Sequence, residues 1–295
     1  MKIIRILAII LFIAIVAIFI SAPARYMQSF FDGLTVWAYN VLPALFPFAV
    51  LSNLTFKIAP KNKRSVTRLL FGVSCDNVFL MSLLCGYPIG AKAIADTNST
   101  AESATRACSF CSTAGPIFMI ATVGAKLLQN TTATIIVILA HILSAILNGL
   151  IYRKKEFAEL ADTSGEFKAK DFGDTISSSV LSVLSVGGLI ALFYMLTDML
   201  KNLLPAAIST SLAFSYAVGL LEMTNGIIDV CKLADTATAT VLASSLLALG
   251  GACVFCQSYA FLATKNVKAV DVLKMKLTQA AFATIISFAL VKIFI

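Results

Sequence analysis

Long apolar runs, separated by short polar segments, dominate the sequence. Most of the runs approach or exceed the roughly 20 residues that a helix needs to cross a bilayer. Two of them, 69–95 and 206–231, are interrupted by Gly, Pro or charged residues. The pattern predicts an all-α polytopic membrane protein with apolar runs at residues 6–20, 36–56, 69–95, 107–128, 134–152, 176–204, 206–231, 236–263 and 272–295.

The composition supports a membrane protein and excludes several other classes. Of the 295 residues, 59% are hydrophobic and 13% are charged, whereas soluble domains contain about 45–50% and about 25%. The excess apolar surface needs the lipid bilayer as a second solvent, and it leaves no room for a soluble catalytic domain or a nucleic-acid reader. The seven cysteines are odd in number and lie mostly in apolar surroundings, which is not typical of a secreted disulfide framework.

The chain divides into two similar halves around one polar stretch. Residues 34–152 and 176–295 each contain a long run, an interrupted run, a run with a Gly break and a clean run, in this order. Weak internal symmetry of this kind is typical of repeat-built transporters. Residues 1–33 would form an N-terminal transmembrane helix and connector, although a cleaved signal peptide would also fit the first run. Residues 153–175 would form a cytoplasmic polar linker.

The positions of the basic residues predict the orientation of the runs. If both interrupted runs are re-entrant or broken helices that return to the side they entered, 18 of the 23 Lys and Arg residues lie on the side of the N-terminus. Lys and Arg concentrate on the cytoplasmic side. The sequence therefore predicts an inverted-repeat helical bundle with about seven crossings and an external C-terminus. Its cytoplasmic loops would be 57–68, 92–106, 153–170 and 265–276.

The first interrupted run contains the sharpest candidate for a binding site. Two glycines and a proline close together cannot comfortably continue a helix, and the backbone groups they free must be satisfied by protein, water or substrate. Helix N-termini at such breaks attract anions. A structural kink is the alternative, and Lys92 could equally extend to the membrane interface. The candidates here are Gly86, Tyr87, Pro88, Gly90 and Lys92.

The second interrupted run carries a carboxylate, Glu222, in apolar surroundings. Such a group is costly in a bilayer and marks an ion or substrate path by default, although a Glu at a pore mouth would also fit. Glu222 could bind a coupling proton or cation. Thr224 and Asn225 offer neutral hydrogen bonds, and Gly226 offers a break.

Two further segments complete the candidate site. Ser112 and Thr113 lie in the small-residue segment 109–116, which could line a substrate path or let helices approach closely. Gln257 lies in the segment that begins with Gly250-Gly251. Its amide can hydrogen-bond either to a solute or to a neighbouring helix.

No residue pattern points to catalysis or to a bound metal. Cys108 and Cys111, like Cys253 and Cys256, have CxxC spacing, but free Cys in a membrane helix acts mainly as a small hydrophobe. His141 is the one His in the chain and fits helix packing better than a proton relay. The sequence lacks a Ser-His-Asp set and paired carboxylates, so we expect neither an enzyme nor a cofactor.

Taken together, the motifs resemble those of a known family, the sporulation integral membrane proteins called YlbJ or SpoVV. This family belongs with the Gate or nucleoside-recognition group, which is related to concentrative nucleoside transporters, so the first repeat would be Gate-like. Cys85 and Cys111 stand where Ser or a similar small residue would be expected. The resemblance rests on segments 42–48, 86–92, 112–116, 221–226 and 250–257.

The resemblance implies a multi-pass carrier in the cell membrane of a spore-forming Firmicute, located in the outer forespore membrane. It implies that the cargo is dipicolinic acid, made in the mother cell and moved toward the forespore. A planar dianion would suit helix N-termini, Lys92 and hydrogen-bond donors. We therefore expect a transporter for a small polar, anionic solute with a coupling proton or sodium ion. The alternatives are a non-transporting scaffold or gate subunit of a sporulation complex, or a nucleoside-type carrier.

Overall fold

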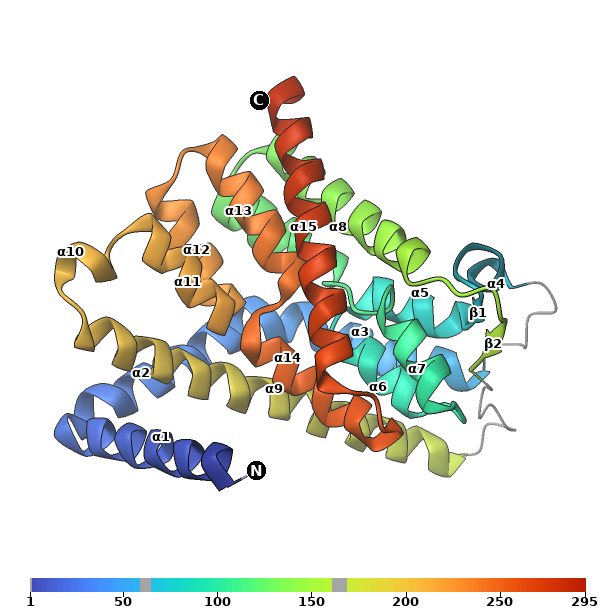
Figure 1. Ribbon diagram of the computed structural model, residues 1–295, viewed down its shortest axis with the longest axis horizontal. Coiled ribbons are helices and arrows are strands. Elements are labelled where there is room, and N and C mark those ends of the chain that lie inside the picture. Colours follow the sequence, from blue (N-terminus) through green and yellow to red (C-terminus); the bar gives the residue numbers. More distant parts are fainter. Residues whose placement is uncertain (1, 59–64, 161–168) are drawn as a thin grey trace.

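The computed structural model describes residues 2–58, 65–160 and 169–295. The described chain is almost entirely helical, apart from a parallel pair of two-residue strands (Figure 1). The first half contains α1 (Lys2–Ser21), α2 (Pro23–Val36), the π-helix η1 (Trp37–Val41), α3 (Leu42–Ile58), α4 (Val66–Phe71), β1 (Val73–Ser74), α5 (Asp76–Cys85), α6 (Ile89–Ala95), α7 (Ala101–Cys108), the π-helix η2 (Phe118–Leu128) and α8 (Thr131–Ile151).

The second half follows strand β2 (Ala158–Glu159), which pairs with β1. It contains α9 (Ala169–Leu203), α10 (Ala206–Ser209), α11 (Leu212–Leu221), α12 (Met223–Leu233), α13 (Thr236–Leu249), α14 (Gly251–Leu262), the 3-10 helix η3 (Ala263–Lys265) and α15 (Ala269–Phe294).

Five helical stretches are long and apolar enough to cross a membrane. Together with the shorter apolar helices, they make the chain an integral multi-pass membrane protein. The two remaining predicted crossings correspond to α1 and to the interrupted pair α7–η2, so the total of seven stays a prediction. The five stretches are Pro23–Leu51, Thr131–Ile151, Phe172–Leu203, Thr236–Lys265 and Ala269–Phe294.

Helix α8 shows how the bundle is organised. The helix begins at Thr131 because the side chain of Asn130 caps it, accepting the amide of Ala133 at 2.9 Å. Its inward face buries His141 and Asn148. Polar groups inside and apolar groups outside are what a lipid solvent favours. Large side chains four residues apart face outward: Ile135, Leu139, Leu143 and Leu147.

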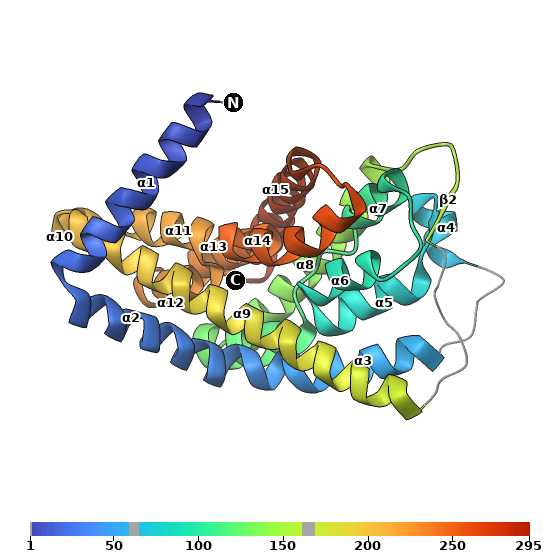
Figure 2. The ribbon, with the colours of Figure 1, turned by 90° about the horizontal axis from the view of Figure 1, so that it is seen from below.

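Two long helical stretches form the frame of the bundle. The stretch α2–η1–α3 lies beside α9 along the longest axis of the molecule (Figure 2). Gly33 allows this approach, since a Cβ there would lie 2.7 Å from the Cα of Ala191. Helix α1 diverges from the frame in Figure 2, and its last turns pack near Tyr26 through Ile18 and Phe19.

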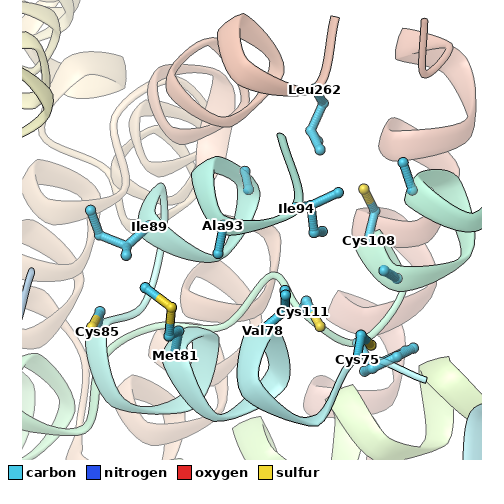
Figure 3. Close-up of a cluster of buried hydrophobic side chains, with 14 of the residues drawn as sticks. Cys75, Val78, Met81, Cys85, Ile89, Ala93, Ile94, Cys108, Cys111 and Leu262 are labelled. Atoms are coloured by element: carbon cyan, nitrogen blue, oxygen red, sulfur yellow. The ribbon is translucent and has the colours of Figure 1, made fainter. Parts of the chain in front are cut away.

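Each interrupted run folds as a helical hairpin. In hairpin 1, α5 and α6 lie antiparallel across a turn at residues 86–88, and Figure 3 shows the buried side chains that they bring together. In hairpin 2, α11 and α12 pack against each other across a turn at Glu222. Hairpin 1 starts from the end of the molecule that carries β1 and β2, whereas hairpin 2 starts from the opposite end, beside α10 (Figure 1).

The basic loops gather at the end that carries β1 and β2. Arg106 donates to the carbonyl of Glu156 at 2.8 Å, which joins the loop after hairpin 1 to the segment after α8. Lys265 donates to the carbonyl of Thr97 at 2.6 Å, which adds the loop before α15. Three of the four predicted cytoplasmic loops therefore meet directly.

The fourth predicted cytoplasmic loop also reaches this end, because Arg68 lies 4.7 Å from the ring centroid of Phe157. Lys154 forms an ion pair with Glu102 at 2.8 Å nearby, and its hydrogen bond lowers the pKa of Glu102 below the ordinary value. Four basic residues assigned to these loops lie outside the described residues: Lys61, Lys63, Arg64 and Lys168.

Different ion pairs hold the opposite end together. Arg25 at the start of α2 pairs with Asp198 of α9 at 3.1 Å, and Lys201 of α9 pairs with Asp229 of α12 at 2.7 Å. Three of the five basic residues that the sequence leaves outside the cytoplasmic loops, Arg25, Lys201 and Lys232, line one hollow here. The four predicted cytoplasmic loops and these three basic residues thus lie at opposite ends of the molecule.

This division predicts the topology. A single cysteine placed at residue 154, in a variant without native cysteines, should react with an impermeant maleimide only after the cell membrane is opened. A cysteine appended after Ile295 should react in intact cells, because α15 leads away from the basic end (Figure 1). Labelling of both positions from the same side would contradict the predicted seven crossings.

Candidate functional site

The tips of the two hairpins face a common cavity in the middle of the bundle. Its volume is about 50 Å³. Four of the polar residues singled out from the sequence line it: Tyr87, Glu222, Thr224 and Gln257. The rest of its wall is largely apolar and comes from Val41, Ala44, Leu45, Cys85, Ala114, Gly115, Phe118, Val186, Ile190, Met223 and Val254.

Two broken helices complete the site. The first break is the non-helical segment 109–115 between α7 and η2, and the second break lies at Gly250, between α13 and α14. Each break packs against the tip of one hairpin, as the following contacts show. The site is therefore built from four places where a helix stops inside the bundle.

The tip of hairpin 1 rests on the first break. Gly86 ends α5 with a φ of 78°, and a Cβ there would collide with the backbone nitrogen of Gly115. Only glycine suits both the positive φ and the close approach. The amide of Tyr87 donates to the carbonyl of Thr113 at 2.7 Å. A backbone hydrogen bond therefore joins hairpin 1 to the break.

The side chain of Tyr87 connects the two halves of the protein. Its hydroxyl lies 2.8 Å from the sulfur of Met223, at the start of α12, and donates to the carbonyl of Leu247 in α13 at 3.1 Å. Both partners belong to the second half. The ring of Tyr87 thus closes the space between the hairpin tips.

Side chains from other helices satisfy the backbone of the first break. Asn148 of α8 donates to the carbonyl of Ser109 at 2.7 Å, and the Nε2 of His141 accepts the amide of Ala114 at 2.7 Å. His141 therefore supports the break, in line with the packing role expected for it. These bonds replace the helical bonds that the break removes, which an apolar bundle requires.

Glu222 caps helix α12 instead of facing a cationic side chain. Its carboxylate accepts the amide of Asn225 at 2.6 Å and the amide of Thr224 at 3.1 Å. Within the described residues it takes part in no ion pair. A carboxylate at a helix N-terminus interacts favourably with the helix dipole, which explains how this group is tolerated while 1% exposed.

Two amides near the cavity bond to different partners. Asn225 donates to the hydroxyl of Thr197 in α9 at 3.1 Å, so it ties hairpin 2 to the long helix and does not line the cavity. Gln257 lines the cavity, and its amide nitrogen lies 3.2 Å from the sulfur of Cys253. Of these two amides, that of Gln257 is therefore the one that borders the cavity.

The second break depends on glycine. Gly250 and Gly251 have φ values of 80° and 69°. A Cβ on Gly251 would lie 2.8 Å from the carbonyl oxygen of Gly219 and 3.2 Å from that of Leu221. The end of α11 thus rests on the start of α14, much as hairpin 1 rests on the first break.

Several predicted site residues support the hairpins without lining the cavity. Pro88 caps α6. Because Gly90 has no side chain, the carbonyl of Cys111 can approach it closely. The backbone of Gly219 approaches Gly226 for the same reason. Thr113 donates to the carbonyl of Ser82 at 2.6 Å and is buried.

Lys92 and Ser112 also lie away from the cavity wall. The ammonium of Lys92 pairs with Asp96 at 2.7 Å, one turn further along and toward the basic end. Lys92 therefore matches the interfacial alternative. The side chain of Ser112 is part-exposed. Its backbone carbonyl accepts a hydrogen bond from Lys276.

Lys276 is not among the predicted site residues, and the sequence predicts that it lies in the cytoplasmic loop 265–276. The structure places it inside α15 with 5% exposure, so that prediction is wrong. Its ammonium donates to the carbonyl of Ser112 at 3.0 Å. The available signal was its position between Met275 and Leu277 in an apolar run, but the nearby Lys274 made the segment look like a loop.

Comparison with known proteins gives one relative. The sporulation integral membrane protein YlbJ of Bacillus subtilis (strain 168) is 26% identical in an alignment that covers 93% of this chain and 79% of the relative. This chain is a distant homologue of that protein, which confirms the resemblance drawn from the motifs. No protein-family model and no solved structure matches the chain.

The packing of hairpin 2 predicts the effect of one methyl group. In Gly226→Ala, the new Cβ would collide with the Cα of Gly219, and overpacking of this kind costs about 1–3 kcal/mol. We expect a lower midpoint of thermal unfolding in detergent. Gly188→Ala is the matched control, because a Cβ there meets nothing within 4 Å. Equal midpoints for the two variants would contradict the tight packing of α11 on α12.

Proposed function

We propose that this homologue of YlbJ is a membrane transporter for a small polar, anionic solute. The observation that carries the proposal is the convergence of two hairpin tips and two broken helices on one cavity. Broken helices that meet in the middle of a bundle are how many carriers build substrate and ion sites. A scaffold would have no need for a buried carboxylate beside a cavity.

The size of the cavity supports a closed state of such a carrier. A volume of about 50 Å³ holds one or two water molecules, whereas ligand pockets usually measure about 300–1,000 Å³. A solute could enter only if the hairpin tips separate. The contact between Tyr87 and Met223 is where this separation would begin.

We also propose that the two halves form an inverted repeat. Each half runs in the order long helix, hairpin, broken helix and unbroken helix: α2–η1–α3, α5–α6, α7–η2, α8 and then α9, α11–α12, α13–α14, α15. The hairpins start from opposite ends of the molecule (Figure 1). In this arrangement each hairpin would cover the cavity from its own side, as alternating access requires.

The charges near the cavity favour an anion accompanied by a proton or cation. The N-terminus of α12 lies at the tip of hairpin 2, and the N-terminus of α14 packs against the end of α11; helix N-termini attract anions. Glu222 holds the amides of α12 in the closed state. A proton or sodium ion on Glu222 would remove its repulsion of an anionic solute.

The homology to a sporulation protein makes dipicolinate the first solute to test, with the outer forespore membrane as the proposed location. Purified protein in liposomes should accumulate labelled dipicolinate, and excess unlabelled dipicolinate should compete while nucleosides should not. Competition by nucleosides would instead favour a nucleoside-type carrier. Absence of uptake for both classes would favour a scaffold and contradict the proposal.

Glu222→Gln tests the role of the charge. Glutamine keeps the size and one oxygen that can accept the amide of Asn225, so we expect normal insertion and a near-normal unfolding midpoint. If Glu222 binds the coupling ion, the variant should lose accumulation of dipicolinate together with its dependence on pH or sodium. Normal accumulation at a normal protein level would leave Glu222 as a helix cap only.

A further inference from the structure

Lys276 is a buried lysine with no acidic partner. It lies in α15, which is one of the membrane-spanning stretches. Its side chain is buried, whereas Lys274, two residues earlier, is exposed. Within the described residues Lys276 takes part in no ion pair. A buried charge without a partner is costly in a bilayer and is a functional candidate by default.

Neutral groups take the place of a counter-ion. The ammonium donates to the carbonyl of Ser112 at 3.0 Å and lies 3.4 Å from the side-chain oxygen of Gln279. It also lies 5.3 Å from the ring centroid of Tyr87. Carbonyl oxygens and an aromatic face stabilise a cation. The stabilisation of this positive charge therefore depends on the position of the first break.

The same backbone segment forms the cavity wall. Ser112, bonded to Lys276, is two residues before Ala114, which lines the cavity. The ring of Tyr87 lies near the ammonium, and Tyr87 also lines the cavity. A change of charge at Lys276 is therefore transmitted to both the wall and the tip of hairpin 1.

Few other titratable groups face this ammonium. They are His141 from α8, Cys108 from α7 and Tyr87 from hairpin 1. Helices α13 and α14, which also pack on α15, contain no charged residue. His141 accepts the amide of Ala114, so it is held in its neutral form in this conformation.

We propose that Lys276 is a proton-binding site that controls the first break. With its proton, the ammonium holds the carbonyl of Ser112 and keeps hairpin 1 closed on the cavity. Without the proton, the charge-assisted bond is lost and the break is free to move. This inference rests on the proposed transport function, because Lys276 would supply the coupling proton for the first break, which lies in the half of the carrier without Glu222.

Hydrogen–deuterium exchange tests the site without any solute. In the purified wild-type protein, exchange in peptides covering 109–116, corrected for the intrinsic effect of pH, should rise at least tenfold as Lys276 loses its proton. Protonation of His141 would act in the opposite direction, since it opens the bond to Ala114 as the pH falls. The sign of the change therefore identifies the group.

Three variants separate charge from titration. Lys276→Arg keeps a positive charge that cannot be lost, so its break should stay protected as the pH rises. Lys276→Met lacks the donor and should exchange rapidly even where wild type is protected. Lys274→Arg is the matched control on the exposed side of the same helix and should behave like wild type. A rise in exchange with increasing pH that persists in Lys276→Arg belongs to Tyr87 or Cys108 and overturns the proposal, as does a flat wild-type profile.

Transport then tests the coupling. In liposomes, Lys276→Arg should lose dipicolinate accumulation driven by a pH gradient, at least tenfold relative to Lys274→Arg. Full accumulation by Lys276→Arg would refute a coupling role. If wild type moves no dipicolinate, the proposed function fails, while the exchange profiles still decide whether Lys276 controls the break.

Discussion

Backbone groups that are freed where helices stop inside the bundle determine much of this structure. In a bilayer such groups find no water, so each must be satisfied by the protein itself. At the first break the partners are Asn148, His141, Lys276 and the amide of Tyr87. At hairpin 2 the carboxylate of Glu222 serves the amides of α12. The packing of α8 and α15 around the centre follows from this requirement.

The breaks in the two halves are satisfied by charges of opposite sign, both supplied by the second half. At the first break Lys276 of α15 holds a carbonyl, and at hairpin 2 the carboxylate of Glu222 holds two amides. Between them, the Tyr87 hydroxyl contacts a thioether and one carbonyl. A thioether is a weak acceptor, and a typical hydrogen bond contributes only about 0.5–1.5 kcal/mol net. The polar contact between the hairpin tips is therefore weak.

The sequence predicts the breaks well because they are local features. Gly86, Pro88 and Gly250 each disfavour the continuation of a helix through local backbone effects. Glu222 is also readable as the residue before a helix, although we interpreted it mainly as an ion-binding group. The roles of Gly90, Gly226 and Lys276 could not be read in this way, because they depend on which backbone approaches from another element. A glycine in the sequence does not show what it touches, and a lysine beside Lys274 does not show that it is buried.

The aromatic residue that begins η1 gives the molecule an optical property. Trp37 is the one tryptophan in the chain, and its ring packs against Gly187 of α9, where a Cβ would lie 2.7 Å from the ring. It stands one helical turn before Val41, which lines the cavity. Intrinsic tryptophan fluorescence of the unmodified protein therefore comes from a single residue at the seam between the two long helical stretches. Any sliding of the halves past each other would change its surroundings and its emission, without a label.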